Sequence, residues 1–183
     1  MTQTDIEFVE LEEIDEAQLV TLMNDARVRR HLPLLAGEFS RDDCRAFVAA
    51  KRRLWTEHGQ GPWAILVHGE FAGWGGVQPE HGEADLALVL DPRFWGWGGP
   101  ICRAIVARAF DQMELGAITA LLPPSRVNRR AITRLGFVEA GRSMIEGRPF
   151  IRFLLANTRQ RRAPDLAASP DDRAMAADEG SVR

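Results

Sequence analysis

The chain has 183 residues, of which 45% are hydrophobic, so it is long enough to form one domain with a sizeable core. Its formal net charge of -3 argues against nonspecific nucleic-acid binding, and no apolar run approaches the length of a membrane span. Residues 1–13 show no signal peptide, so we expect a cytoplasmic protein. Cys44 and Cys102 lack metal-ligand and disulfide spacing, so we expect reduced thiols and no metal site.

Hydrophobic periodicity divides residues 6–155 into short strands and helices. Ser40 and Asp43 form a capping-box pattern, which predicts where the longest helix begins. The expected strands cover residues 6–11, 63–67, 71–77, 84–90, 117–122, 137–145 and 149–155. The expected helices cover residues 16–24, 40–58, 100–113 and 125–135, with a further helical turn or two at 26–32. The order β-α-α-β-β-β-α-β-α-β-β predicts an α/β protein of the α+β kind, with about seven strands in a mixed sheet flanked by four helices.

Residues 91–102 read Asp-Pro-Arg-Phe-Trp-Gly-Trp-Gly-Gly-Pro-Ile-Cys and connect a predicted strand to a predicted helix. Such a glycine-rich turn binds anions, because its backbone N–H groups are free and the helix N-terminus adds partial positive charge. We therefore expect a phosphate-bearing ligand that is held by main chain. A Rossmann dinucleotide site is excluded, because neither Gly73-x-Gly75 nor Gly96-x-Gly98 has a third glycine three residues on.

Three stretches, Asn24–Pro33, Asp91–Gly98 and Arg134–Phe137, occur in the order and spacing of a known family. With them the chain resembles the GNAT-type N-acetyltransferases, and among these the RimJ/RimL-like branch, over roughly residues 5–155. The resemblance implies an acetyltransferase-like domain at 1–157. The composition of residues 158–183, rich in Ala, Asp, Arg, Pro and Ser without apolar periodicity, predicts a disordered tail.

The resemblance implies acetyl-CoA as cosubstrate and a primary amine as acceptor, which attacks the thioester directly. The acceptor is either a protein N-terminus or a small amine, and the acidic net charge favours a cationic one. His31 and Glu38, near the first helices, are the candidate substrate-binding residues. The oligomeric state stays open between monomer and homodimer. Dimers are common in the resembled family, and the last hairpin offers a strand edge for pairing.

Because an amine is mostly protonated at neutral pH, the reaction benefits from a general base. The resemblance places Asp85 at this position, on the strand before the glycine turn; Glu83 is the second candidate and His81 the third. A solvent-facing Asp85 without function stays the alternative. The chain contains no tyrosine, so the phenol that usually reprotonates the CoA thiolate in this family is missing. Ser125 is a candidate proton donor in its place.

The resemblance also implies how the cofactor lies. The pantetheine arm pairs with Val89 and Leu90 as an added strand, and backbone N–H groups near Leu90 hold the oxyanion. The pyrophosphate lies on the N–H groups of residues 95–101, although Pro100 departs from the family pattern and removes one donor. The candidate cofactor-binding residues are Val89, Leu90, Trp95, Gly96, Trp97, Gly98, Gly99, Ile101 and Asn128. Core packing is the alternative role for Trp95 and Trp97.

A second hypothesis is a CoA-binding sensor or assembly module of the same fold that does not catalyse. The missing tyrosine and Pro100 favour this hypothesis, whereas Asp85 and the intact Gly96-x-Gly98 favour the enzyme. Turnover with any amine acceptor distinguishes the two hypotheses.

Overall fold

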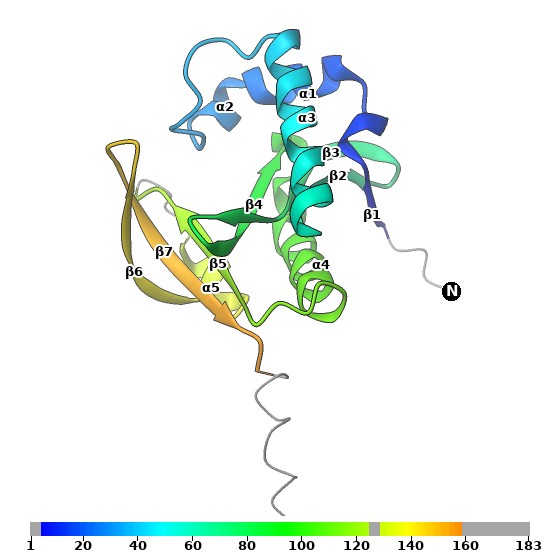
Figure 1. Cartoon of the computed structure of the whole chain (residues 1–183). Coiled ribbons are helices and arrows are strands. Elements are labelled where there is room, and N and C mark those ends of the chain that lie inside the picture. Colours follow the sequence, from blue (N-terminus) through cyan, green and yellow to red (C-terminus); the bar gives the residue numbers. More distant parts are fainter. Residues whose placement is uncertain (1–4, 125–128, 159–183) are drawn as a thin grey trace, which may run out of the picture.

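A seven-stranded sheet in the order β1-β2-β3-β4-β5-β7-β6 forms the centre of the molecule in the computed structural model, which describes residues 5–124 and 129–158 (Figure 1). The strands are β1 (Ile6–Val9), β2 (Pro62–Val67), β3 (Glu70–Glu80), β4 (Glu83–Leu90), β5 (Ala117–Leu122), β6 (Val138–Ile145) and β7 (Arg148–Ala156). The helices are α1 (Glu16–Asn24), α2 (Ala26–Arg29), α3 (Arg41–His58), α4 (Gly98–Asp111) and α5 (Arg129–Arg134), with 3₁₀ helices η1 (Leu11–Glu13) and η2 (Pro92–Trp97).

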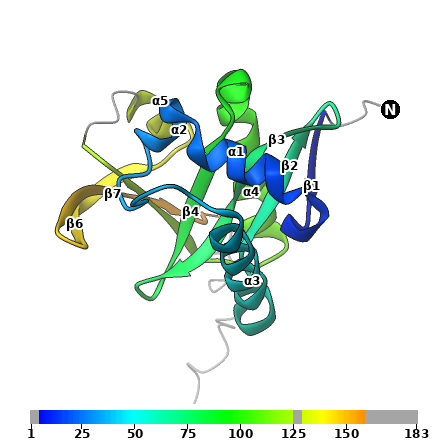
Figure 2. The ribbon, with the colours of Figure 1, turned by 90° about the horizontal axis from the view of Figure 1, so that it is seen from above.

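Helices cover both faces of this sheet and form a separate core on each. On one face, α4 packs against the strands through the fully buried Ile101 and Ile105. On the other, α1 and α3 contribute Leu19 and Cys44 to a second core. Figure 2 shows α3 and α4 on opposite sides of the sheet. Because successive strand residues point to opposite faces, the neighbours on β4, residues 89 and 90, belong to different cores.

Most predicted elements are confirmed, including the strand at 117–122 and the helix at 16–24. The capping box is also present: Asp43 N–H donates to the Ser40 hydroxyl (3.1 Å), and Ser40 N–H donates to the Asp43 carboxylate (2.9 Å). The turn predicted at 26–32 is the short helix α2, which raises the number of α-helices in the described residues to five. The predicted tail, apart from Thr158, lies outside the described residues, within which no helix is long and apolar enough to cross a membrane.

Gly73 on β3 lies where the sheet cannot accept a side chain. Its φ is +147°, and a Cβ atom there would lie 2.1 Å from the Val89 carbonyl oxygen and 2.8 Å from the Leu90 Cα atom. Both atoms belong to the backbone of β4, so they cannot move aside without disturbing the strand. Gly96 in η2 is the opposite case, since its φ is not positive and its Cβ position has nothing within 4 Å.

We therefore predict that Gly73→Ala lowers the free energy of unfolding by at least about 2 kcal/mol, because of backbone strain and overlap. Gly96→Ala serves as the control and should stabilise the protein by up to about 1 kcal/mol, because it restricts the unfolded chain. Urea unfolding followed by circular dichroism measures both changes. Equal effects of the two substitutions would contradict the tight approach of β3 to β4.

Candidate functional site

The sheet opens between its two central strands. Strands β4 and β5 are parallel neighbours, yet the described residues pair at only one position, Asp85 with Thr119. Strand β4 continues from there to Leu90, and along its other edge it pairs with β3 over its full length. Beyond Asp85, this edge of β4 therefore has no backbone pairing with β5 among the described residues, although β5 continues to Leu122, and we call this unpaired stretch the opening in the sheet.

The alternation of hydrogen bonds along β4 identifies which backbone groups face this opening. Asp91 N–H donates to the Ala72 carbonyl at 2.8 Å, so Asp91 directs its polar groups to β3. In an antiparallel ladder every second residue does the same. Val89 therefore also faces β3, and Leu88 and Leu90 face the opening. By this alternation Leu88 and Leu90 are better placed than Val89 to pair with a ligand, and the expected role of Val89 stays a prediction.

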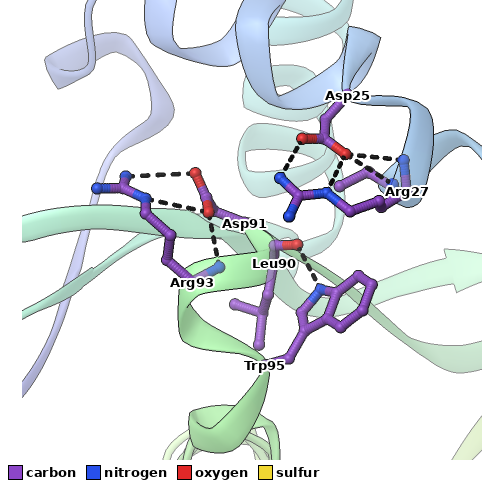
Figure 3. A network of polar contacts seen from close by, with 7 residues as sticks. Asp25, Arg27, Leu90, Asp91, Arg93 and Trp95 are labelled. Carbon is purple, nitrogen blue, oxygen red and sulfur yellow. Dashed lines mark hydrogen bonds and ion pairs between the residues drawn. The ribbon is translucent and has the colours of Figure 1, made fainter.

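Trp95 lies at the end of the opening and contacts two parts of the chain. Its indole Nε1 donates to the Leu90 carbonyl at 3.0 Å (Figure 3). Its ring, 48% exposed, meets His31 edge-to-face with the centroids 6.0 Å apart. Two of the predicted site residues, one for cofactor and one for substrate, thus lie together. Glu38, the other predicted substrate residue, is exposed in the loop before α3.

The same junction carries two aspartates that begin helices in the same way (Figure 3). Asp25 accepts the backbone N–H of Arg27 and pairs with its guanidinium, both at 2.8 Å, and this hydrogen bonding lowers the pKa of Asp25 to about 2. Asp91 accepts the backbone N–H of Arg93 at 2.8 Å and its guanidinium at 3.2 Å. These contacts hold the start of α2 and the start of η2 in defined conformations beside β4.

Asp85 occupies the point where β4 and β5 part. Its side chain shares the α3 side of the sheet with that of Val89 and is 9% exposed. The Thr119 hydroxyl donates to its carboxyl oxygen at 3.3 Å. Burial raises the pKa of Asp85 to about 7 against this hydrogen bond, and the charges of Glu80 and Glu83 add to the increase. Asp85 is therefore a buried acid that gains and loses its proton near neutral pH.

The other predicted catalytic residues differ from Asp85 in their surroundings. Glu83 is exposed and forms a two-fold ion pair with Arg152, Nε to Oε2 at 2.8 Å and Nη2 to Oε1, which lowers the pKa of Glu83. A carboxylate stabilised in this way is a poor base. His81 is exposed and lies 3.3 Å from the Glu80 carboxylate. Ser125 lies outside the described residues, as does Asn128 from the predicted cofactor set.

A row of polar side chains crosses the α3 side of the sheet at the level of Asp85. Lys51 Nζ on α3 donates to Gln78 Oε1 at 2.7 Å, and Gln78 is paired with Asp85 across β3 and β4. Burial lowers the pKa of Lys51, while the charge of Glu80 opposes this effect. Sequence reasoning missed Lys51 and Gln78. The available signal was a lysine on the otherwise apolar face of the helix at 40–58.

The predicted glycine turn is a 3₁₀ helix, η2, that runs directly into α4. It therefore exposes fewer donors than expected: Gly98 N–H donates to the Trp95 carbonyl, and Pro100 has no N–H. The side chain of Ile101 is fully buried in the core beneath α4, and Trp97 packs on the same core and against His68. Packing thus occupies both of these side chains, and the expected contact of a pyrophosphate with the backbone N–H groups of residues 95–101 stays a prediction.

The three glycines at this helix start have no structural requirement within the described chain. Gly96, Gly98 and Gly99 lack positive φ. The nearest atoms to a Cβ at Gly98 and Gly99 are side-chain atoms at 3.8 and 3.7 Å, and Gly96 has nothing within 4 Å. The N-cap residue Trp97 makes no side-chain hydrogen bond to the helix. A surface without side chains at a helix N-terminus fits the close approach of a phosphate group.

A family model described as "Acetyltransferase (GNAT) domain" matches residues 5–138. The chain belongs to the GNAT acetyltransferase family. It is accordingly an N-acetyltransferase with acetyl-CoA as cosubstrate, and the opening beside β4 and the glycine surface of α4 fit that molecule. No curated protein matches the sequence of this acetyltransferase.

Solved acetyltransferase structures share the fold of this GNAT protein. An acetyltransferase from Agrobacterium tumefaciens has 14% identity and a TM-score of 0.69, with 86% of this chain and 94% of that one covered. Spermidine N-acetyltransferase from Vibrio cholerae, in complex with CoA and spermine, has 15% identity and a TM-score of 0.68, covering 84% and 96%. Aminoglycoside acetyltransferase AAC(6')-Ib, in complex with coenzyme A, has 15% identity and a TM-score of 0.66, covering 86% and 97%.

Residues 5–124 and 129–158 of this acetyltransferase contain no group of three or more His, Cys, Asp or Glu side chains that could hold a metal ion.

The buried acid predicts a pH-dependent stability. Between about pH 4 and pH 7, folded Asp85 keeps the proton that the unfolded chain releases, so the free energy of unfolding falls as the pH rises. A pKa near 7 instead of 3.8 corresponds to a cost of up to about 4 kcal/mol at pH 8. Asp85→Asn should therefore stabilise the protein at pH 8 and lose this advantage at pH 4.

Chemical denaturation at the two pH values measures the effect. Glu139→Gln, at an exposed carboxylate on β6, is the matched control and should change stability little at either pH. A destabilised Asp85→Asn protein at pH 8 would contradict the assigned burial of the carboxyl group.

Proposed function

We propose that this acetyltransferase transfers the acetyl group of acetyl-CoA to a primary amine by direct attack on the thioester, with Asp85 as general base. The observation that carries the proposal is the position of Asp85. It is a buried acid whose pKa is raised to about 7, at the one position where the described residues of β4 and β5 pair and from which the opening begins. A base with a pKa near the working pH is the most effective one for proton transfer.

Bound acetyl-CoA supplies an acetyl group activated as a thioester. In our proposal the backbone groups of Leu88 that face the opening pair with the pantetheine amides, as an added strand would, while the Leu90 carbonyl keeps its bond to Trp95. Leu90 N–H is the candidate donor to the carbonyl oxygen as negative charge develops on it. The glycine surface at residues 96–99 receives the pyrophosphate at the start of α4.

Asp85 accepts the proton that the amine loses on attack, directly or through water. A protein α-amine has a pKa near 7.8 and matches a base of pKa about 7 better than a lysine amine near 10.4. The chain has no tyrosine to return a proton to the departing thiolate. Ser125 remains the candidate donor, and an unassisted departure is compatible with the low pKa of a thiol.

The acceptor approaches from the α1–α3 side in this proposal, because the side chain of Asp85 points to that side of the sheet. In Figure 1 the α2–α3 loop and the β6–β7 turn lie on the same side of the view. His31 and Glu38 belong to that loop and are the proposed acceptor contacts. We propose the RimJ/RimL-like branch, whose acceptors are protein N-termini or small amines. The spermidine and aminoglycoside acetyltransferases of similar fold make small amines part of the first screen.

We further propose a cytoplasmic protein that forms a homodimer through β6. This strand is the last in the sheet order, so one of its edges lacks a partner among the described residues. Val138 and Met144 on it are 61% and 68% exposed. An exposed strand edge with apolar side chains favours pairing with a second copy.

If Asp85 is the base, Asp85→Asn should lower turnover at pH 7 by about 10²-fold or more. In wild type, kcat/KM should rise as the pH increases through about 7, because the ionised form of Asp85 is the active one. This rising limb of the pH profile should be absent in the Asp85→Asn variant. Steady-state assays of CoA release against an amine panel measure both effects. Glu139→Gln should keep wild-type activity, and an Asp85→Asn protein with an unchanged profile would refute the assignment.

If the pyrophosphate lies on the glycine surface, Gly98→Val should abolish the stabilisation by acetyl-CoA while the protein stays folded. The backbone at Gly98 (φ −54°, ψ −41°) is ordinary helix, which a side chain tolerates. In wild type, acetyl-CoA at a hundredfold excess over Kd should add about 2.7 kcal/mol, seen as a rise in Tm. Ala107→Val, at an exposed position further along α4, is the control and should keep the full ligand effect. Equal ligand effects in both variants would contradict the assigned position of the pyrophosphate.

A further inference from the structure

The sheet consists of two parts that meet at one backbone pairing position. Strands β1–β4 form antiparallel pairs with one another, as do β5, β7 and β6. Between the two parts, the described backbone pairs only at Asp85 and Thr119. Side-chain contacts therefore help to hold the two parts together. One of them is made by the Thr119 hydroxyl, which lies 3.3 Å from both the Ala84 carbonyl oxygen and the Asp85 carboxyl oxygen.

Arg152 provides a second and longer connection. It belongs to β7, which lies beyond β5 as seen from β4, and it pairs with Leu121 of β5. Its guanidinium reaches across β5 to both carboxylate oxygens of Glu83 at the start of β4. A third contact, at 3.3 Å, joins it to the Ala140 carbonyl on β6. Two-fold Arg–carboxylate pairs are geometrically specific and strong, so this side chain ties β4 to the strands on the far side of the opening.

The same pair affects the charge around the proposed base. Glu83 lies two residues before Asp85 and on the same side of the sheet. The groups that face Asp85 are Glu80 from β3, Glu83 from its own strand and Thr119 from β5, with Lys51 from α3 behind Gln78. Both glutamates raise the pKa of Asp85, and Arg152 is the cation that pairs with one of them.

We propose that Arg152 is a positioning residue for acetyl transfer. Through Glu83 it holds β4 to the β5–β7–β6 part at the closed end of the opening, and it neutralises the carboxylate that stands beside Asp85. Its effect on the reaction is indirect, through the width of the opening and through the ionisation of the base. The inference rests on the proposed role of Asp85 in catalysis.

The test uses four variants of the full chain: Arg152→Met, Glu83→Gln, the double variant, and Arg142→Met as a control at an exposed arginine on β6. Arg152→Met should shift the limb of the kcat/KM profile upward by about 0.5 to 1 pH unit, because the unpaired Glu83 charge favours protonated Asp85. Glu83→Gln should shift it downward. The double variant should return close to the wild-type midpoint, because the cation and the anion are both gone.

The other half of the proposal, that Arg152 holds β4 to the β5–β7–β6 part of the sheet, is tested by measuring acetyl-CoA affinity with calorimetry. All three variants without the ion pair should bind acetyl-CoA more weakly, by about 3- to 10-fold, whereas Arg142→Met should not. A merely structural role of Arg152 would weaken binding without moving the pH profile. The proposal is overturned if Arg152→Met has the same pH profile and the same acetyl-CoA affinity as Arg142→Met. It is also overturned if the shift of the pH profile persists in the double variant.

A readout without catalysis separates this inference from the proposed function. The stability difference between Asp85 and Asp85→Asn proteins reports the ionisation of Asp85 directly. The same stability difference can be measured in proteins that also carry Arg152→Met. The pH range over which the difference changes should then move upward by the same amount as the activity profile. If that range moves while the activity profile does not, Arg152 controls Asp85 but Asp85 is not the base. If the range is unchanged, the inference about Arg152 fails irrespective of catalysis.

Discussion

The parting of β4 and β5 is the constraint on which the rest of the structure depends. A strand in the middle of a sheet normally satisfies its backbone on both edges, and β4 does so on one edge alone beyond Asp85. The groups left are those of Leu88 and the N–H of Leu90, since the Leu90 carbonyl already accepts from Trp95, and they are obligatory hydrogen-bonding groups in an otherwise apolar stretch of the strand. This arrangement is costly unless a ligand or water completes it, and it explains why a molecule with amide groups along an extended arm suits the position.

The position of Asp85 follows from the same constraint. Where the strands still touch, the sheet is closed and water is excluded, so a carboxyl there is desolvated and its pKa rises. The closed end of the opening is therefore the place where a buried acid lies nearest to the backbone groups that face a ligand.

Sequence patterns were sufficient for features that depend on near neighbours in the chain. The Ser40–Asp43 capping box, the helix at 16–24 and the strand at 117–122 are local, and each was predicted at its observed place. The glycine turn became a 3₁₀ helix because the Asp91 cap and the Pro92 backbone favour helical continuation. The choice between Val89 and Leu88 depended on the register with β3, which a single strand does not reveal. The burial of Asp85 needed Thr119, 34 residues away, and the partner of Glu83 is 69 residues away.

The existence of two cores separated by the sheet has a consequence for how this family member could change its substrate. The α4 core supports the helix start and the proposed cofactor surface, whereas α1–α3 rest on the other face and carry the proposed acceptor contacts. Residues in the two cores share the strands but have no side chains in common, because neighbouring strand positions point apart. Repacking of the α1–α3 layer can therefore reshape the acceptor side while the cosubstrate side keeps its support. The sheet thus acts as a partition, so that a change of packing on the proposed acceptor side need not reach the proposed cosubstrate side.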